Sequence, residues 1–535
     1  MISGGESETV IDVARAPQRS APLGATGAAF LCAAVAVLFP LTLGGKLNGA
    51  TELVSILGSA ALLVLAGAIS TRRLVAPPSL RRTTWMLLPL CVLLSLQLVP
   101  LPVGLLENVA GKAAEAYRHV PVEHGTISLD AAASREQVSW LLALLGIGGL
   151  FVSIPRLDGG ALLVRQHATP GERRRLVPHP LDRVNQILLH GVLIAGAVSS
   201  AVAVLHQVQG ATALFGVVPI AGSHRRAAFP FANANALAAM MEMTLLLGAG
   251  FLLRAFEARE RRSDGYPRRW VWLYGASVLL SSSTLLLSAS RVGITVSAFG
   301  LLTLGYFVSR YRGFAAFRRR KAARIGPPSS RRSLEQRMMV WLSGIGLSVL
   351  IVVALIVLLG DAGTEVVQER FGAGVEQGLD EARRGFLAAS IDALPDYWLF
   401  GAGLGCWHLA VAPAIEEHLA HLRLDYAHNE FLQLFIETGI LGVFALIGVV
   451  VVLSQQIRRY WHDTASYVDR LEVLSLLLAL LLPFLHGMLD FPFHIPALAF
   501  LYVVILAVLV RKVDPVAGQA SEDAVISRER RVSAG

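Results

Sequence analysis

Apolar runs alternate with short polar connections along almost the whole chain. The runs are about 20 residues long, the length that a helix needs to cross roughly 30 Å of hydrocarbon. They lack the regularly spaced polar positions of a helix on the surface of a soluble core. The pattern therefore predicts an all-α polytopic membrane protein with about 12 transmembrane helices. The expected spans lie near residues 25–44, 51–70, 84–102, 138–155, 185–207, 234–254, 271–288, 292–309, 340–360, 430–453, 472–490 and 495–510.

The connections between these spans divide the chain into five regions. They are a cytoplasmic N-terminal tail (1–24), transmembrane helices 1–9 (25–360), a long extracytoplasmic loop domain between spans 9 and 10 (361–428), transmembrane helices 10–12 (429–511) and a disordered cytoplasmic tail (512–535). The N-terminal tail lacks a short apolar run with a small-residue cleavage site, so the first span is expected to be its own insertion signal. A second outer segment spans 103–137, and the long loop contains a predicted amphipathic helix, Glu376–Leu394.

Basic residues are distributed unevenly between the two sides of this topology. The net charge is +9, and 36 of the 47 Lys and Arg residues fall on the side that holds both termini. Because cytoplasmic loops carry an excess of Lys and Arg, both termini are predicted to be cytoplasmic. Topology and contact with membrane lipid explain clusters such as Arg318-Arg319-Arg320-Lys321, and no nucleic-acid partner is expected.

Cysteine and histidine spacing gives no sign of a metal or a cofactor. The chain has three cysteines, and no two of them have the spacing of a disulfide or a metal site. Glu417, His418 and His421 lie close together in the long loop. They do not form a His-Glu-x-x-His motif and no third ligand matches, so neither a metal nor a cofactor is expected.

Basic residues on the outer side run against the charge trend, and the first of these lie at Arg225-Arg226. The loop then enters the next predicted span through Asn233-Ala-Asn235, where either asparagine could cap the helix. A helix N-terminus beside a guanidinium favours a phosphate or diphosphate. An ordinary cap beside lipid headgroups is the open alternative.

Arg291 interrupts what would otherwise be one continuous apolar stretch. Ser288 and Ser290 precede it, and Gly293 allows a turn or a close packing contact. With a predicted span on each side, Arg291 must lie near the membrane surface, where an ionisable residue is a functional candidate. The alternative is that its side chain extends to the lipid headgroups.

The end of the long loop carries a candidate general base, His428. Asn429 is the expected N-cap of the following span, and Gln433 and Glu437 share its face. Glu430 follows the cap directly. An imidazole with polar neighbours near arginines has the properties of a general base, although a solvated loop histidine is the alternative.

Other polar residues add to this picture. Arg383 and Arg384 lie on the predicted loop helix, ahead of the turn Gly401-Ala-Gly403-Leu-Gly405, which we interpret as a tight loop. His486 and Asp490 are one helical turn apart and are expected to satisfy each other. Glu242 falls inside the sixth predicted span and needs a polar partner.

Several of these stretches together resemble the O-antigen ligase/O-antigen polymerase superfamily of bacterial envelope enzymes. The matching elements are Arg226-x-x-x-x-Phe231-x-Asn233-x-Asn235, Ser288-Ala-Ser290-Arg291, Pro395…Gly401-x-Gly403-x-Gly405 and His428-Asn429-Glu430…Glu437-x-Gly439-x-x-Gly442, preceded by Ile127-Ser-Leu-Asp130. The resemblance covers roughly residues 120–510, and the order of the elements makes it specific. Phe229 departs from the pattern, because the family usually has glycine there.

The resemblance implies a metal-independent, inverting glycosyl transfer on the periplasmic face. The donor would be a glycan on undecaprenyl diphosphate, and the acceptor a hydroxyl of a glycan, lipid or protein. By this likeness His428 would activate the acceptor, while Arg226 and Arg291 would hold the diphosphate. Arg225, Arg383 and Arg384 are further candidates for the diphosphate, with Asn233, Asn235, Asn429, Glu430 and Glu437 in support.

Two other functions compete with this hypothesis. A glycolipid transporter or flippase would also have about twelve spans with both ends inside, but such proteins tend to show repeated halves and polar residues at mid-membrane. No repeat is visible here, and the polar residues gather at one face. A structural subunit of a polysaccharide export system is the second rival. Within the family, the sequence leaves ligase, polymerase and protein O-glycosyltransferase open.

Overall fold

A computed structural model gives the arrangement of these segments. It describes residues 23–46, 49–70, 78–118, 122–154, 183–219, 226–231, 233–260, 268–322, 377–419, 425–464 and 466–514. The predicted span near 340–360, the first part of the long loop and most of both predicted tails lie outside the described residues, although the first helix begins at Leu23 and the last helix reaches Val513.

Long helices make up most of the described chain. They are α1 (Leu23–Leu38), α2 (Ala50–Ser70), α3 (Pro78–Leu98), α6 (Ala131–Ser153), α7 (Arg183–Val208), α8 (Ala234–Glu260), α9 (Arg268–Leu287), α10 (Arg291–Ala322), α13 (Gln377–Tyr397), α15 (Glu430–Asp463), α16 (Tyr467–Gly487) and α17 (Pro496–Val513). Except for α13, which is the predicted loop helix, each corresponds to one predicted span. The described residues are therefore mostly helical, as predicted.

Length and composition allow many of these helices to cross a membrane. Within the described residues, seven are long and apolar enough by both criteria, and three shorter apolar helices accompany them. The chain is therefore a multi-pass membrane protein, while the count of twelve spans stays a prediction. Two breaks in the apolar sequence set helix ends: Ser290 caps α10 by accepting a hydrogen bond from the backbone N–H of Gly293 at 3.3 Å, and Asn429 caps α15.

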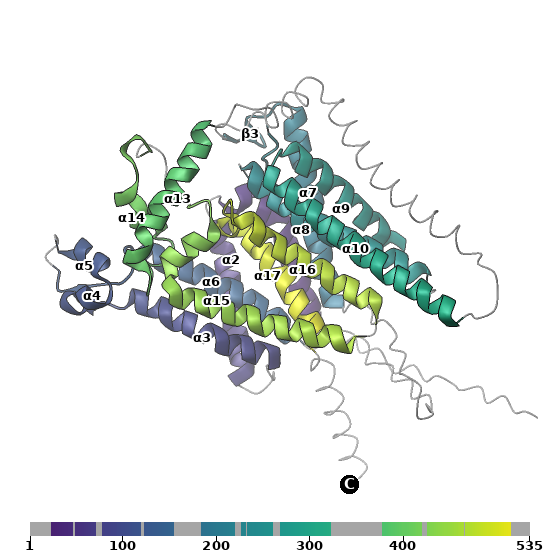
Figure 1. Ribbon diagram of the computed structural model, residues 1–535, viewed down its shortest axis with the longest axis horizontal. Coiled ribbons are helices and arrows are strands. Elements are labelled where there is room, and N and C mark those ends of the chain that lie inside the picture. The colour runs from purple at the N-terminus through teal and green to yellow at the C-terminus, as the bar shows by residue number, and fades with distance from the viewer. Residues whose placement is uncertain are drawn as a thin grey trace, which may run out of the picture.

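The helices pack as a bundle around α8 (Figure 1). An 18-residue apolar stretch within Ala234–Phe256 of α8 is 89% buried, because α7, α9, α10 and α16 all pack against this helix. A second set of contacts joins α2 to α6, and α3 lies along α15. Small residues permit the closest contacts: a Cβ at Gly58 of α2 would lie 2.4 Å from the backbone oxygen of Ala143 in α6.

A smaller lobe stands at one end of the bundle (Figure 1). It contains α4 (Val103–Val109), α5 (Gly111–Tyr117), α13, α14 (Trp407–Val411), the 3-10 turns η3 (Ala412–Ala414) and η4 (Glu417–Leu419), and the two-residue strands β1 (Leu101–Pro102) and β2 (His124–Gly125). The remaining short elements are η1 (Phe39–Leu41), η2 (Leu43–Gly45), η5 (Pro492–His494), β3 (Ala213–Leu214) and β4 (Val218–Pro219). Strands β1 and β2 pair antiparallel, as do β3 and β4.

The lobe joins the two segments that the charge pattern placed outside. The backbone N–H of Leu129 donates to the carbonyl of Ala402 at 2.9 Å, and Lys112 Nζ lies 4.0 Å from a carboxylate oxygen of Asp396. A buried cluster around Trp407 and Phe386 forms the core on the α13–α14 side. The two segments therefore lie on the same side of the bundle, as the predicted topology requires.

The opposite ends of the helices are tied by buried charges. Lys512 of α17 lies 2.8 Å from Asp469 and 3.2 Å from Glu472 of α16, and Glu472 also lies 3.1 Å from Arg254 of α8. The guanidinium of Arg511 donates to the Asn185 side chain at 2.8 Å. All these residues are at helix ends that the predicted topology places on the cytoplasmic side.

Candidate active site

A cavity of about 300 Å³ opens where the outer helix ends meet the small lobe. Its walls come from the start of α10, from α13, and from the segments that precede α15 and follow α16. The residues that line it are Asn235, Ser290, Arg291, Val292, Arg383, Arg384, Leu387, Ala427, His428, Asn429, Met488 and Leu489. Six predicted site residues are among them. The cavity therefore brings together side chains separated by about 200 positions in the sequence.

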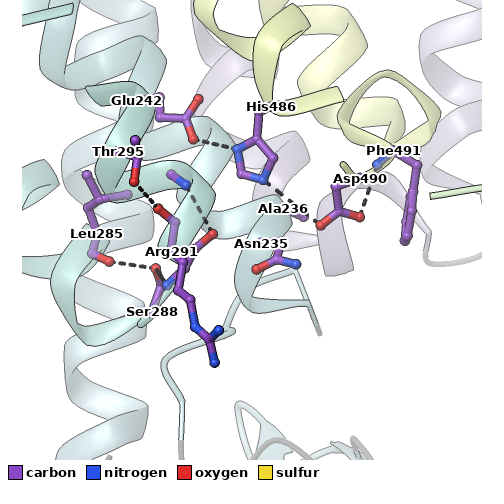
Figure 2. A network of polar contacts seen from close by, with 12 residues as sticks. Asn235, Ala236, Glu242, Leu285, Ser288, Arg291, Thr295, His486, Asp490 and Phe491 are labelled. Atoms are coloured by element: carbon purple, nitrogen blue, oxygen red, sulfur yellow. Dashed lines mark hydrogen bonds and ion pairs between the residues drawn. The ribbon is translucent and has the colours of Figure 1, made fainter. Parts of the chain in front are cut away.

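Arg291 is the first residue of α10 and extends from the turn between α9 and α10 (Figure 2). The turn is fixed by Ser288, whose hydroxyl donates to the carbonyl of Leu285 at 2.6 Å, and by Ala289, which has a left-handed φ of 49°. A non-glycine residue in that region is strained by roughly 1–2 kcal/mol. The turn thus holds the Arg291 side chain, which is exposed, at the edge of the cavity.

Arg226 lies beside the cavity but does not line it. Its Nε donates to the carbonyl of Ser288 at 2.8 Å, and its Nη2 donates to Asn235 Oδ1 at 3.0 Å. Burial lowers the pKa of Arg226, and the nearby charges of Arg383 and Arg291 lower it further. Arg226 therefore pins the α9–α10 turn to the start of α8 and adds positive charge behind the cavity wall.

The two asparagines at the start of α8 have different partners. Asn233 Oδ1 accepts from the backbone N–H of Asn235 at 2.8 Å and of Ala236 at 3.4 Å, so Asn233 is the cap. Asn235 instead holds Arg226 and reaches the cavity.

Phe229, at the position that departs from the family pattern, packs against the ring of His206, with ring centroids 4.5 Å apart. Arg225 lies outside the described residues.

His428 has a left-handed φ of 52° and stands directly before the cap of α15. The cap is Asn429, whose Oδ1 accepts from the backbone N–H of Phe431 at 3.1 Å and of Leu432 at 3.0 Å. Strain at a non-glycine residue that the surrounding structure maintains is a recognised feature of functional sites. The geometry places the imidazole at the N-terminal end of α15, and the His428 side chain is 26% exposed.

Asp490 is the closest charged partner of His428, with Oδ1 3.4 Å from Nδ1 of the ring. The same oxygen accepts from the backbone N–H of Phe491 at 3.0 Å. Burial acts to raise the pKa of the Asp490 carboxyl, but the contact with His428 and the positive charges of His486 and Arg383 outweigh it. The pKa of Asp490 therefore lies below its ordinary value, and the carboxylate is ionised.

The sequence analysis paired His486 with Asp490, and that pairing is secondary. His486 Nδ1 lies 2.5 Å from Glu242 Oε1, whereas its Nε2 is 4.0 Å from Asp490 Oδ2. Figure 2 shows Glu242, His486 and Asp490 in succession. Glu242 thus has the polar partner that its burial demanded. One-turn spacing predicted the wrong main partner because α8, far away in the sequence, brings a carboxylate closer.

Glu430 does not line the cavity. Its Oε1 accepts from the backbone N–H of Phe493 at 2.6 Å, and its Oε2 lies 2.8 Å from Nδ1 of His494. Burial acts to lower the pKa of His494, but the carboxylates of Glu430 and Glu437 raise it to about 9. Glu430 therefore holds the turn between α16 and α17, the same turn that carries Asp490.

Glu437 holds the glycine-rich loop by hydrogen bonds to its backbone. It is 2% exposed, accepts from Gln433 Nε2 at 3.0 Å, and also accepts from the backbone of Gly405 and Trp407. Here α15 is broken at Gly439, with φ 63° and ψ −171°. The loop at 401–405 is a tight loop, as expected, since Gly401, Gly403 and Gly405 all have positive φ.

The arrangement is suited to handling an anion beside a proton acceptor. Arg291, Arg383 and Arg384 supply guanidinium groups around one cavity, and guanidinium forks bind phosphate oxygens well. His428 stands at the same cavity with a carboxylate against its Nδ1. Among the described residues, no three His, Cys, Asp or Glu side chains group closely enough to hold a metal ion.

Of the residues at this site, Asp490 was not assigned to it by the sequence. The only signal was its place near the outer end of a predicted span, where a carboxylate is unusual. His421, one of the residues weighed as a metal ligand, lies outside the described residues, and His418 pairs with Glu416 at 3.3 Å.

Comparison with known proteins identifies the central part of the chain. Residues 276–447 match the family model described as O-antigen ligase. The matched segment contains Arg291, Arg383, Arg384 and His428, whereas Arg226, Glu242, His486 and Asp490 lie outside it. No curated protein sequence matches the chain. The resemblance found in the sequence is thus confirmed for residues 276–447, where this multi-pass membrane protein carries a domain that matches the O-antigen ligase family.

Proposed function

We propose that this protein transfers a glycan from undecaprenyl diphosphate to an acceptor hydroxyl at the periplasmic face of the bacterial inner membrane, as a surface-polysaccharide polymerase or O-antigen ligase. The family supports a glycan-transfer role of the ligase or polymerase type. The observation that carries the finer proposal is the single cavity that holds His428 together with three arginines. A lipid diphosphate leaving group needs such charges, and a hydroxyl nucleophile needs such a base.

The reaction follows from this placement. The acceptor O–H gives its proton to His428 as the acceptor oxygen attacks the anomeric carbon of the donor. The bond from that carbon to the diphosphate oxygen breaks, its electron pair stays on the diphosphate, and the configuration inverts. Arg291, Arg383 and Arg384 stabilise the charge that develops on the leaving group. The proton on His428 then passes to solvent or to the released undecaprenyl diphosphate. The step needs no metal.

Asp490 orients the base in this mechanism. Its contact on Nδ1 leaves the other ring nitrogen, Nε2, to accept the proton, and the carboxylate stabilises the imidazolium that forms. The acceptor is a sugar hydroxyl of a second lipid-linked repeat in a polymerase and of the lipid A core in a ligase. A transporter has no need for a base at one membrane surface, so the cavity favours the transferase.

Purified protein with a lipid-linked glycan donor tests the proposal through His428→Ala. The variant is expected to lose about 10²–10⁴-fold in turnover, because general-base catalysis contributes that much, while donor binding stays close to wild type. His418→Ala is the matched control, since it removes an outer-lobe histidine that does not line the cavity. Near-normal turnover in His428→Ala would refute the proposal.

A further inference from the structure

Glu242 is buried in the centre of the bundle although a carboxylate there is costly. It is 0% exposed on α8, and its Oε2 has no hydrogen-bond partner among the described residues. Taking an ion out of water costs several kcal/mol unless its partners compensate. Elsewhere α8 is tied to α9 by neutral groups, as in the 2.8 Å contact between the hydroxyls of Thr244 and Ser281. Packing alone therefore does not explain an acid at this position.

The partners of Glu242 lead toward the cavity in three short steps. Glu242 Oε1 lies 2.5 Å from His486 Nδ1, His486 Nε2 lies 4.0 Å from Asp490 Oδ2, and Asp490 Oδ1 lies 3.4 Å from His428 Nδ1. His486 is 1% exposed and Asp490 is 4% exposed. Figure 2 shows its inner part, from Glu242 of α8 through His486 of α16 to Asp490, and the series ends at His428, the histidine that lines the cavity among the described residues.

The ring of His486 packs against the buried side of the Asp490 carboxylate. The Asp490 carboxylate is held by hydrogen bonding at one oxygen, Oδ1, which accepts from the backbone N–H of Phe491. Its other oxygen, Oδ2, has no hydrogen-bond partner among the described residues. The Oδ2 edge faces His486, whose own rotation is limited by Glu242. Gly293 of α10 brings a second helix against Glu242, since a Cβ there would lie 3.0 Å from Oε1.

We propose that Glu242 and His486 are positioning residues for the transfer reaction: Glu242 holds the His486 ring, the ring holds Asp490, and Asp490 aligns His428. The inference rests on the proposed function, because it takes His428 as the base. The charged groups around the series are Arg383, which faces Asp490 and His486 from α13, and Arg226 and Arg291 from the α8 and α10 ends. Neither positioning residue touches the substrate.

The test is Glu242→Gln, which keeps the size of the side chain and removes its charge. Loss of the hydrogen-bond partners that orient metal-ligating histidines costs about 10–100-fold, and by analogy turnover should fall about 10-fold here while KM for the lipid-linked donor stays within about twofold. In a purely structural role, the fraction of folded protein would fall but turnover per folded molecule would not. Thr244→Val, on the same helix and outside the series, is the control and should keep wild-type turnover.

A double-mutant cycle with Asp490→Asn decides whether the effect passes through Asp490. Once Asp490→Asn has lowered turnover, adding Glu242→Gln should lower it no further, because coupled residues are not additive. Multiplicative losses would overturn the inference, and so would wild-type turnover in Glu242→Gln. If Glu242→Gln does not fold, His486→Gln, whose side-chain amide can still donate to the Glu242 carboxylate, carries the same expectation. Normal turnover in His428→Ala would instead refute the proposed function, so the two failures are distinguishable.

Discussion

At the scale of single residues, the arginines at the cavity divide into two groups. Arg291 and Arg384 are exposed at the lining, whereas Arg226 is held by the Ser288 carbonyl and by Asn235 behind it. A guanidinium that already donates to protein oxygens has fewer N–H groups left for a diphosphate. Because Arg291 lines the cavity and Arg226 does not, we expect Arg291 to contribute more to donor binding than Arg226, whose replacement should chiefly loosen the turn between α9 and α10.

Arg291→Ala should weaken donor binding. A hydrogen bond to a charged group contributes about 1.5–3 kcal/mol, which is roughly a 10–100-fold change in affinity. Titration of the purified variant with a lipid-linked donor measures it, and turnover at saturating donor should fall less than binding does. Arg135→Ala is the control, because Arg135 is an exposed arginine of α6 that does not line the cavity. Equal donor affinities in the two variants would contradict the assignment.

His494 gives the protein a pH-dependent stability. Its pKa is raised from 6.5 to about 9 by the carboxylates of Glu430 and Glu437, against the effect of burial. A histidine with a raised pKa stabilises the folded state fully below pH 6.5, and this contribution, up to about 3 kcal/mol, is lost as the pH rises through 9. Thermal unfolding in detergent between pH 6 and 10 should show the decline, and His494→Gln should flatten it. Parallel curves for both proteins would exclude the effect.

At the scale of elements, the glycine-rich loop and the kinked helix α15 depend on each other. The backbone N–H of Ala402 donates to the carbonyl of Ile436 at 2.8 Å, and that of Gly403 donates to the carbonyl of Glu437 at 3.1 Å. The backbone N–H of Ile440 donates to the carbonyl of Trp398 at 2.7 Å. The break at Gly439 frees backbone groups of α15 for these bonds. The loop therefore fixes the first turns of α15, and His428 lies directly before the N-cap of that helix.

Gly401→Ala should disrupt this contact between the glycine-rich loop and α15. Gly401 has a φ of 77°, and a Cβ there would lie 2.3 Å from the backbone oxygen of Glu437. Left-handed strain alone costs about 1–3 kcal/mol, and the contact adds to it. A lowered thermal midpoint and faster proteolysis near 395–407 are the expected results. Gly111→Ala is the matched control: Gly111 lies in α5 of the same lobe, no atom lies within 4 Å of the added Cβ, and its stability should be unchanged or slightly raised.

At the scale of the whole molecule, polar contacts gather at the two ends of the bundle. The cavity and the lobe lie at one end, and the ion pairs of Lys512, Asp469, Glu472 and Arg254 lie at the other. The side chosen for each end rests on the excess of Lys and Arg in the loops. The orientation is a prediction that labelling can test.

Introduced thiols should show which end faces the periplasm. In a Cys91→Ser background, with Cys32 and Cys406 buried, Lys112→Cys and Asp396→Cys should react with an impermeant reagent added to intact cells with a permeabilised outer membrane. More generally, thiols in 361–428 should be modified and those in 310–338 spared, with Arg310→Cys as the protected control. The reverse pattern would place the cavity on the cytoplasmic face and would contradict the proposed reaction as well.

Features that depend on neighbouring residues could be predicted from the pattern along the chain. Hydrocarbon thickness fixes the length of a span, so apolar runs located the helices, and local hydrogen bonding made Asn429 a recognisable cap. Motif order pointed to His428 and Arg291. Only the tertiary structure decided which distant side chains meet: Asp490 behind His428, Glu242 against His486, and Glu430 against His494 rather than at the cavity. Such pairs depend on how α8, α15 and α16 pack together, and no spacing along a single helix records the distance between residues on different helices.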